Sequence, residues 1–347
     1  MSRDAEKARP AMKAPGGPAT KRQILQFGTV ALALLFVGPS RVAEPEQPTK
    51  VFRIVELNPT AGFGESQRAF RQALRGLGYV HGENILIEDR FAAGSEDRLR
   101  EYAAEAVGLK VDVIVAISSS AVQAATNATK TLPIVAVDLE SDPVAGGFVA
   151  NLARPGGNVT GVFLDLPELN GKQLQLLKEA IPGITRVAVL WNPTVSPTPL
   201  RAAEGAARAL GLQLQIVAAQ RPSDFDSAFS AAVRGRNAAL MVIPSPMFGG
   251  ARSKLIGDLA TKHRLPTTSM LSSYTDAGLL MSYGVNVANL FSQAAAYVDK
   301  ILKGAKPGDL PVQRPVRFEM IVNLKIAKAL GLTIPPSVLS RADRVVE

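Results

Sequence analysis

Leu152-Ala-Arg-Pro-Gly-Gly-Asn-Val-Thr-Gly161, near the middle of the 347-residue chain, is the stretch that decides the fold. Pro155 has no backbone N–H, and Gly156 and Gly157 adopt positive φ angles readily, so no helix continues through it. Val159 to Phe163 then begins a new apolar strand. Because strand and helix patterns alternate on both sides, we expect two α/β lobes with a cleft between them that holds a small molecule.

Short apolar runs alternate with segments of helical periodicity in both halves of the chain. The expected strands are Val51–Leu57, Asn84–Phe91, Val111–Ile117, Pro133–Val137, Val159–Phe163, Arg186–Leu190, Gln213–Val217, Ala238–Ile243, Thr267–Met270, Leu279–Tyr283 and Phe318–Val322. The helices between them include a short one over Val144–Leu152 and a long amphipathic one over Val287–Leu302. Strict alternation of apolar strands with helices predicts an α/β fold with parallel sheets covered on both faces.

Composition excludes several kinds of chemistry. The chain has no cysteine, which removes disulfides, thiol nucleophiles and thiolate metal sites. Its formal charge is +9, but residues 1–43 hold seven Lys or Arg and two acidic residues, so the rest of the chain carries only +4. No run of Lys and Arg in that remainder is long enough to follow a phosphate backbone, and we expect no nucleic-acid partner.

The N-terminal charge has a different explanation. Lys21 and Arg22 precede the uninterrupted apolar stretch from Phe27 to Val37. A basic start followed by roughly 7–15 apolar residues is typical of a secretory signal peptide, and a membrane-spanning helix needs roughly 20. We predict a signal peptide over residues 1–43 with cleavage after Ala43; cleavage after Ser40, a start at Met12 and an uncleaved anchor are the alternatives.

Polar residues gather where the expected strands end. Ligands of parallel α/β sheets bind outside the carboxyl ends of the strands, so these residues are the candidates for a ligand site. They are Asn58, Thr60, Ser118, Ser119, Ser120, Glu140 and Asp142 in the first half, and Trp191, Asn192, Ser245, Ser269, Tyr283 and Asn286 in the second.

Each of the most suggestive candidates has two interpretations. Ser119 and Ser120 begin a helix, where free N–H groups suit a carboxylate, but serine there is also an ordinary helix cap. Asp142 precedes Pro143 as a cap does, or else Asp142 or Glu140 pairs with a ligand ammonium group. Trp191, the only tryptophan, either stacks on a flat ligand or packs between the lobes.

The pattern argues against an enzyme. Only two histidines occur, and neither His81, after a helix-ending glycine, nor His263, in the last turn of a helix, is placed near the strand ends. A Ser/His triad and a histidine metal site are therefore not expected. Gly-rich phosphate-binding signatures are absent. We predict no catalytic residue, no metal and no cofactor. A secreted α/β hydrolase is the least favoured of the three functions that we consider.

Several motifs in order resemble a known family, the ABC-transporter substrate-binding proteins of the tryptophan/tyrosine-binding type. The resemblance covers nearly all of Val51–Glu347 and is carried by Phe70-Arg-Gln-Ala-Leu-Arg-Gly-Leu-Gly-Tyr79, Gly82-Glu-Asn-Ile85, Asp142-Pro143, Leu152–Gly161, Val187-Ala-Val-Leu-Trp-Asn-Pro193, Ala277-Gly-Leu-Leu-Met-Ser-Tyr-Gly284, Ala296-Tyr-Val-Asp-Lys-Ile-Leu-Lys-Gly-Ala-Lys-Pro307, Asn323-Leu-Lys325 and Ala329-Leu-Gly-Leu-Thr-Ile-Pro335. It implies a type I periplasmic-binding-protein fold, with two Rossmann-like lobes joined by crossing hinge strands.

The resemblance also implies where a ligand sits. Ser118 to Ser120 match the family's Ser/Thr-rich loop, where a ligand carboxylate would lie, and Asp142 matches an Asp-Pro turn that faces the cleft. Pro244-Ser245-Pro246 stands where tryptophan-binding members tend to have a more polar loop with an aspartate, which leaves open another small carboxylate, amide or aromatic ligand.

The sequence therefore predicts a periplasmic solute-binding protein, acting as a monomer. Residues 51–163 with 284–315 are the predicted N-terminal lobe, and residues 164–283 with 316–347 the C-terminal lobe. The protein would capture an aromatic or apolar amino acid, or a related small carboxylate or amide. It would deliver this ligand to an ABC permease with its ATPase and meet the membrane only through that permease. The same fold presented to a membrane receptor as a ligand sensor is the alternative.

Overall fold

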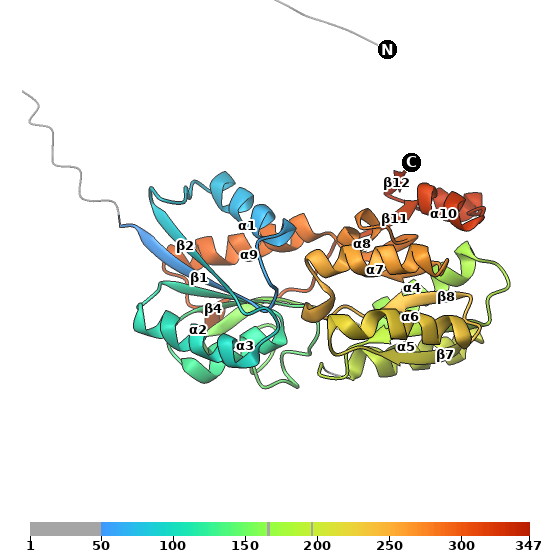
Figure 1. Cartoon of the computed structure of the whole chain (residues 1–347). Helices are drawn as coiled ribbons and strands as arrows, with labels where there is room; N and C mark the ends of the chain where they lie inside the picture. The colour runs from blue at the N-terminus through green and yellow to red at the C-terminus, as the bar shows by residue number, and fades with distance from the viewer. Residues whose placement is uncertain (1–49, 165–166, 196) are drawn as a thin grey trace, which may run out of the picture. The chain divides into compact units, whose positions relative to one another are not determined.

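The computed structural model describes residues 50–164, 167–195 and 197–347. The predicted signal peptide over residues 1–43 lies outside the described residues. Two β-sheets with helices on both faces make up the described chain (Figure 1). None of the described helices has the length and apolar character needed to cross a membrane.

The first sheet is wholly parallel, with strand order β2-β1-β3-β4-β5. Its strands are β1 (Phe52–Asn58), β2 (Ile85–Phe91), β3 (Val113–Ile117), β4 (Ile134–Asp138) and β5 (Val159–Phe163). One face packs against α1 (Glu65–Gly76) and α9 (Val287–Leu302), and the other against α2 (Glu96–Gly108) and α3 (Ser119–Ala128). Burial on both faces explains why each strand is a nearly continuous apolar run.

The second sheet has seven strands in the order β12-β11-β10-β9-β8-β6-β7. They are β6 (Arg186–Trp191), β7 (Gln213–Ala218), β8 (Ala239–Val242), β9 (Thr267–Ser269), β10 (Met281–Val285), β11 (Phe318–Asn323) and β12 (Arg344–Val346). One core contains α4 (Pro167–Ala180), α5 (Thr198–Leu210), α10 (Leu324–Leu330) and α11 (Pro336–Leu339). The other contains α6 (Phe225–Arg234), α7 (Ala251–Lys262) and α8 (Ser272–Asp276).

The chain passes between the sheets at three places. It leaves the first sheet after β5, returns between β10 and α9, and comes back to the second sheet along the segment before β11. Because α9 covers the first sheet while β10 and β11 belong to the second, residues far apart in sequence complete each half. The exact lobe boundaries, at residues 163, 283 and 315, stay a prediction.

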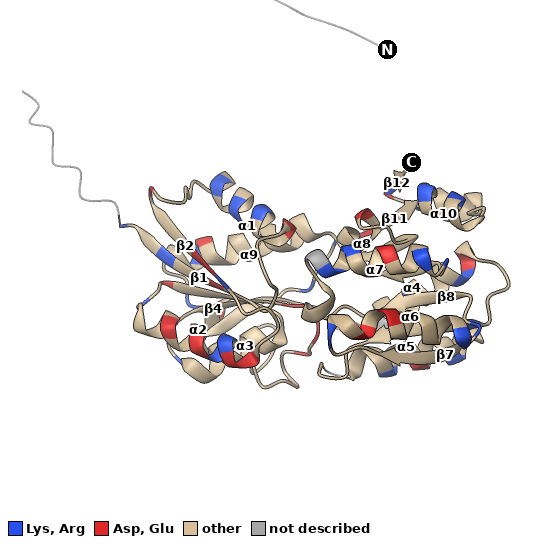
Figure 2. Cartoon of the chain, viewed as in Figure 1, with Lys and Arg blue, Asp and Glu red and all other residues tan. Residues whose placement is uncertain are grey.

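Charged residues of both signs lie along the outer helices (Figure 2). On α7, for example, Lys254 pairs with Asp258 and Lys262 with Asp226 of α6, each over 2.6 Å. Exposed pairs of this kind contribute about 1 kcal/mol or less. The apolar cores against the two sheets are therefore the main source of stability.

Two local expectations were wrong. The short helix expected over Val144–Leu152 is a series of turns, because Gly147 adopts a φ of +71°, which an α-helix does not allow. Asp142 caps the first of these turns by accepting from the N–H groups of Val144 and Ala145. The second sheet is not wholly parallel either, since β10 and β11 pair antiparallel. The terminal strand β12, which the sequence did not suggest, extends the sheet beyond β11.

Gly161 shows why the central stretch needs glycine. Its φ is +137°, and a Cβ atom there would lie 2.1 Å from the backbone oxygen of Ala136 on the neighbouring strand β4. No other residue type fits this close approach of β5 to β4.

Candidate ligand-binding site

Two adjoining cavities lie at the carboxyl ends of the strands. The first, the apolar cavity, has a volume of about 160 Å³; the second, the polar cavity, has a volume of about 300 Å³. Both are lined by residues from the two halves of the chain. Four residues belong to both walls: Pro59, Glu140, Ser245 and Pro246.

The apolar cavity is a hydrophobic chamber. Its apolar walls come from the first sheet, from the segment around α8 and from α9: Ile117, Val137, Leu139, Met270, Leu271, Tyr274, Val287, Leu290 and Phe291. An apolar cavity of about 150 Å³ holds a benzene molecule. A single six-membered ring or a branched aliphatic group therefore fits the apolar cavity.

The polar cavity is built around the start of α3. Ser119, Ser120 and Gln123 of that helix line it, together with Glu140, Asn192 and Thr194. Ser118 caps α3 from an unusual backbone conformation, with φ of +85° and ψ of 160°, a region that is costly for any residue with a Cβ. The N–H groups and the positive dipole end of the helix suit a carboxylate, and the N–H of Ser119 already donates to Glu140.

Glu140 is the carboxyl group shared by the two cavities. Ser119 Oγ donates a hydrogen bond to Glu140 Oε2 over 2.9 Å. Burial, reinforced by the nearby charge of Asp138, raises the pKa of Glu140 to about 7. Asp138 accepts from the N–H of Glu140 over 2.9 Å, and burial raises the pKa of Asp138 to about 6. A cationic ligand group would stabilise the ionised form of Glu140.

The same three-residue turn ends a strand in each half. Asn58 Oδ1 accepts from the N–H of Thr60 over 3.0 Å and from its hydroxyl over 2.8 Å. Asn192 Oδ1 accepts from the corresponding groups of Thr194 over 3.1 and 3.0 Å. Both turns have the sequence Asn-Pro-Thr, and each places its threonine on a cavity wall. The equivalent turns thus bring the two halves to one site.

Seven of the predicted residues line a cavity: Thr60, Ser118, Ser119, Ser120, Glu140, Asn192 and Ser245. Asn192 and Ser245 are buried and joined, since Asn192 Nδ2 donates to Ser245 Oγ over 3.0 Å. The structure thereby brings together residues that sequence alone could assign only to separate strand ends.

The other six lie outside both walls. Asn58 orients Thr60, and the exposed Asp142 caps a turn. Trp191 packs against the core of the second half, and its buried Nε1 has no partner among the described residues. The remaining three have other contacts: Ser269 donates to the Val242 carbonyl, Tyr283 stacks on Phe318, and Asn286 caps α9 and donates to Glu319.

The apolar wall was not predicted. Val287, Leu290 and Phe291 of α9 follow the helical spacing that also marks an ordinary core face, so their periodicity carries no sign of a cavity. The polar residues at strand ends were a better signal, because a buried polar side chain at that place needs a partner.

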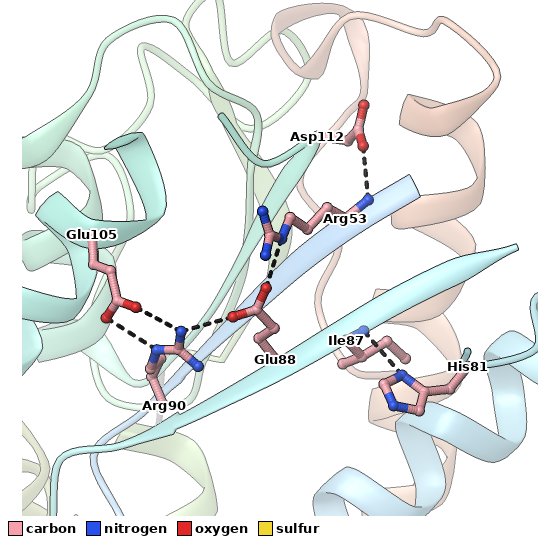
Figure 3. Close-up of polar contacts among 7 residues, drawn as sticks. All are labelled: Arg53, His81, Ile87, Glu88, Arg90, Glu105 and Asp112. Carbon is pink, nitrogen blue, oxygen red and sulfur yellow. Dashed lines mark hydrogen bonds and ion pairs between the residues drawn. The ribbon is translucent and has the colours of Figure 1, made fainter. Parts of the chain in front are cut away.

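Both histidines have contacts away from the cavities. His81 Nδ1 accepts the N–H of Ile87 over 3.0 Å, beside β2, the edge strand of the first sheet (Figure 3). The same strand carries the ion pairs of Glu88 with Arg53 and of Arg90 with Glu105. His263 ends α7, where its ring stacks on Phe229. Among the described residues no group of acidic or histidine side chains has the geometry to hold a metal ion.

The comparison with family models decides the assignment. The model of the ABC transporter substrate binding protein family matches residues 53–346. The chain belongs to this family. It is a substrate-binding protein of an ABC transporter, a class that works outside the cytoplasm and hands its substrate to a membrane permease. Family members and similar solved structures are binding proteins.

Individual relatives agree with this assignment. The tyrosine-binding protein of Clostridioides difficile is 27% identical over 272 residues, 77% of each chain. A conserved domain protein of Vibrio cholerae is 28% identical, with a TM-score of 0.76 over 86% of this chain and 99% of that one. A Streptococcus pneumoniae ABC domain solved with L-Trp shares the fold at 24% identity, with a TM-score of 0.76 over 86% of this chain and all of that one.

Proposed function

We propose that the protein binds one amino acid with an aromatic or other apolar side chain and supplies it to a permease and its ATPase. The observation that carries the proposal is the pairing of an apolar with a polar cavity around Glu140 and Ser245. A free amino acid has the same two parts, an apolar side chain and a charged head. The names of the relatives from C. difficile and S. pneumoniae, tyrosine-binding and bound to L-Trp, support this class.

Each part of the ligand has a counterpart in the site. The side chain would enter the apolar cavity, whose burial of a ring contributes about 2 kcal/mol. The carboxylate would accept hydrogen bonds from the first turn of α3, where Ser119 and Ser120 lie. The ammonium group would pair with Glu140. We assign no catalytic step to any of these residues.

The predicted export and oligomeric state belong to the same proposal. The chain would be exported to the periplasm by its cleaved leader over residues 1–43 and would act there as a monomer. N-terminal sequencing of the exported protein tests the cleavage, with Glu44 as the expected first residue. Light scattering tests the oligomeric state.

A calorimetric and thermal-shift series on residues 44–347 tests the ligand class. We expect at least one of L-tyrosine, L-tryptophan, L-phenylalanine and L-leucine to bind. We expect none of L-aspartate, L-lysine and D-ribose to bind. A ligand at a hundred times its Kd adds about 2.7 kcal/mol to the free energy of unfolding, a visible shift in Tm. Binding of only the charged amino acids or the sugar would refute the proposed class.

A further inference from the structure

Tyr274 is the one phenol on the wall of the apolar cavity in the described part of the chain. It lies in the short helix α8, and its side chain is only 1% exposed. The ring packs in the core of the second half with Phe248 and Leu271. It therefore enters the cavity wall from a rigid element rather than from a loop.

The Tyr274 hydroxyl has no hydrogen-bond partner among the described residues. Burial alone raises the pKa of this phenol, so the hydroxyl stays protonated and is able both to donate and to accept. The fully buried hydroxyls of this half that lack a partner within the described ranges, those of Thr268, Thr275 and Ser282, line neither cavity.

The other polar side chains on the same wall are already engaged, with one exception. Thr60 donates to Asn58, Ser118 bonds to Ser120, and Glu140 accepts from Ser119. Ser245 accepts from Asn192. The exception is Ser66 in the first turn of α1, which is half-buried.

A buried tyrosine hydroxyl normally has a partner, because leaving it without one costs free energy. We propose that Tyr274 determines specificity by hydrogen bonding to a polar atom on the ring of the ligand. The favoured ligand is then an amino acid whose ring carries such an atom, as the phenol of tyrosine does, rather than the bare phenyl ring of phenylalanine. This inference rests on the proposed function and narrows its ligand class.

Selectivity between L-tyrosine and L-phenylalanine would depend on whether the bound ligand gives the Tyr274 hydroxyl a hydrogen-bond partner. L-Tyrosine would give the Tyr274 hydroxyl its missing partner, whereas L-phenylalanine would close the cavity and leave that hydroxyl buried alone. A site built to hydrogen-bond a ligand hydroxyl rejects the analogue without it strongly. Replacement of Tyr274 by phenylalanine keeps the ring and removes this distinction.

Isothermal titration of L-tyrosine and L-phenylalanine against wild type and Tyr274→Phe tests the inference. We expect wild type to bind L-tyrosine at least about ten-fold more tightly than L-phenylalanine, and the variant to lose that ratio through weaker L-tyrosine binding. Tyr79→Phe is the matched control. Its hydroxyl donates to Asp299 over 3.0 Å away from the cavities, so the ligand ratio should stay that of wild type.

The outcomes separate the two proposals. Equal or tighter binding of L-phenylalanine by wild type, or an unchanged ratio in a folded Tyr274→Phe, overturns the role of Tyr274 and leaves the amino-acid function standing. Binding of neither L-tyrosine nor L-phenylalanine overturns the role of Tyr274, and the proposed function falls with it only if L-tryptophan and L-leucine also fail to bind. If the variant fails to fold, which circular dichroism shows, the wild-type ratio alone still decides.

Discussion

Ser119 Oγ donates a hydrogen bond to Glu140 Oε2 over 2.9 Å, which joins the start of α3 to the segment after β4. The pair holds a carboxyl group where the apolar and polar cavities meet. Because the pKa of Glu140 is raised to about 7, a small change in pH, or in the groups that contact its carboxyl, alters its charge.

Glu140→Gln should weaken binding of an amino acid by about 30-fold at pH 8, since it removes the charge that would pair with the ligand ammonium; this corresponds to about 2 kcal/mol. An analogue without the amino group, 3-(4-hydroxyphenyl)propionate, should bind wild type and variant alike. Isothermal titration measures both. Asp142→Asn is the control, because the exposed Asp142 lines neither cavity; a comparable loss there would contradict the placement of the ammonium site.

The affinity of wild type for its amino acid should rise with pH between about 6 and 8. Burial raises the pKa of Glu140 to about 7, so at pH 6 most of the free protein carries a neutral Glu140 that must lose a proton before it pairs with an ammonium group. Titration calorimetry in two buffers of different ionisation enthalpy should show proton release near pH 6.5. Glu140→Gln should show a flatter profile, with Asp138 as the nearby carboxyl that still titrates.

Ser119→Ala should weaken binding most at low pH. The Ser119 hydroxyl favours the ionised form of Glu140, so its loss raises the pKa of that carboxyl further. We expect an affinity loss of about ten-fold at pH 6.5 and a smaller loss at pH 8.5, where Glu140 is ionised in either protein. An equal loss at both values would mean that Ser119 acts only through direct contact with the ligand. Ser227→Ala, an exposed change outside both cavity walls, serves as a control.

Glu56→Gln should make stability less dependent on pH. Glu56 is fully buried, burial raises its pKa to about 7, and its Oε1 accepts from Gln67 over 2.8 Å. Since the folded pKa lies above the ordinary value, this group's contribution to stability is complete below about pH 4.5 and is lost as pH rises through about 7. Urea unfolding at pH 5.5 and pH 8 measures the effect. At pH 8 the free energy of unfolding should be about 1–2 kcal/mol higher for the variant than for wild type. A less stable variant at pH 8 would contradict this account.

Gly161→Ala should be severely destabilising, by about 3 kcal/mol or more. The added Cβ would lie 2.1 Å from the Ala136 oxygen, and the φ of +137° is unfavourable for alanine. Gly157→Ala in the same stretch is the matched control: a Cβ added there would meet no atom within 4 Å, so a change within about 0.5 kcal/mol is expected. Denaturant unfolding of both variants measures the difference, and similar values for the two would count against the close strand approach.

Much of the fold was predictable because its signals are local. Apolar strands and helical spacing are set by neighbouring residues, and Val287–Leu302 has the predicted bounds in the structure. The errors arise where distant segments or special backbone angles decide. The antiparallel pairing of β11 with β10 depends on where the chain returns after α9, and the positive φ of Gly147 keeps Val144–Leu152 from forming a helix.

The order of residues alone was enough to determine the α/β alternation, the need for glycine in the central stretch and the polar residues at the strand ends. The sequence could not decide whether a given polar residue caps a helix or turn or binds the ligand, because both roles use the same residue types. Tertiary structure decided that Glu140 lies on the cavity walls, whereas Asp142 caps a turn and Trp191 packs in a core. It also placed Tyr274 and α9 around one apolar cavity, since a cavity exists only where segments remote in sequence leave space between them.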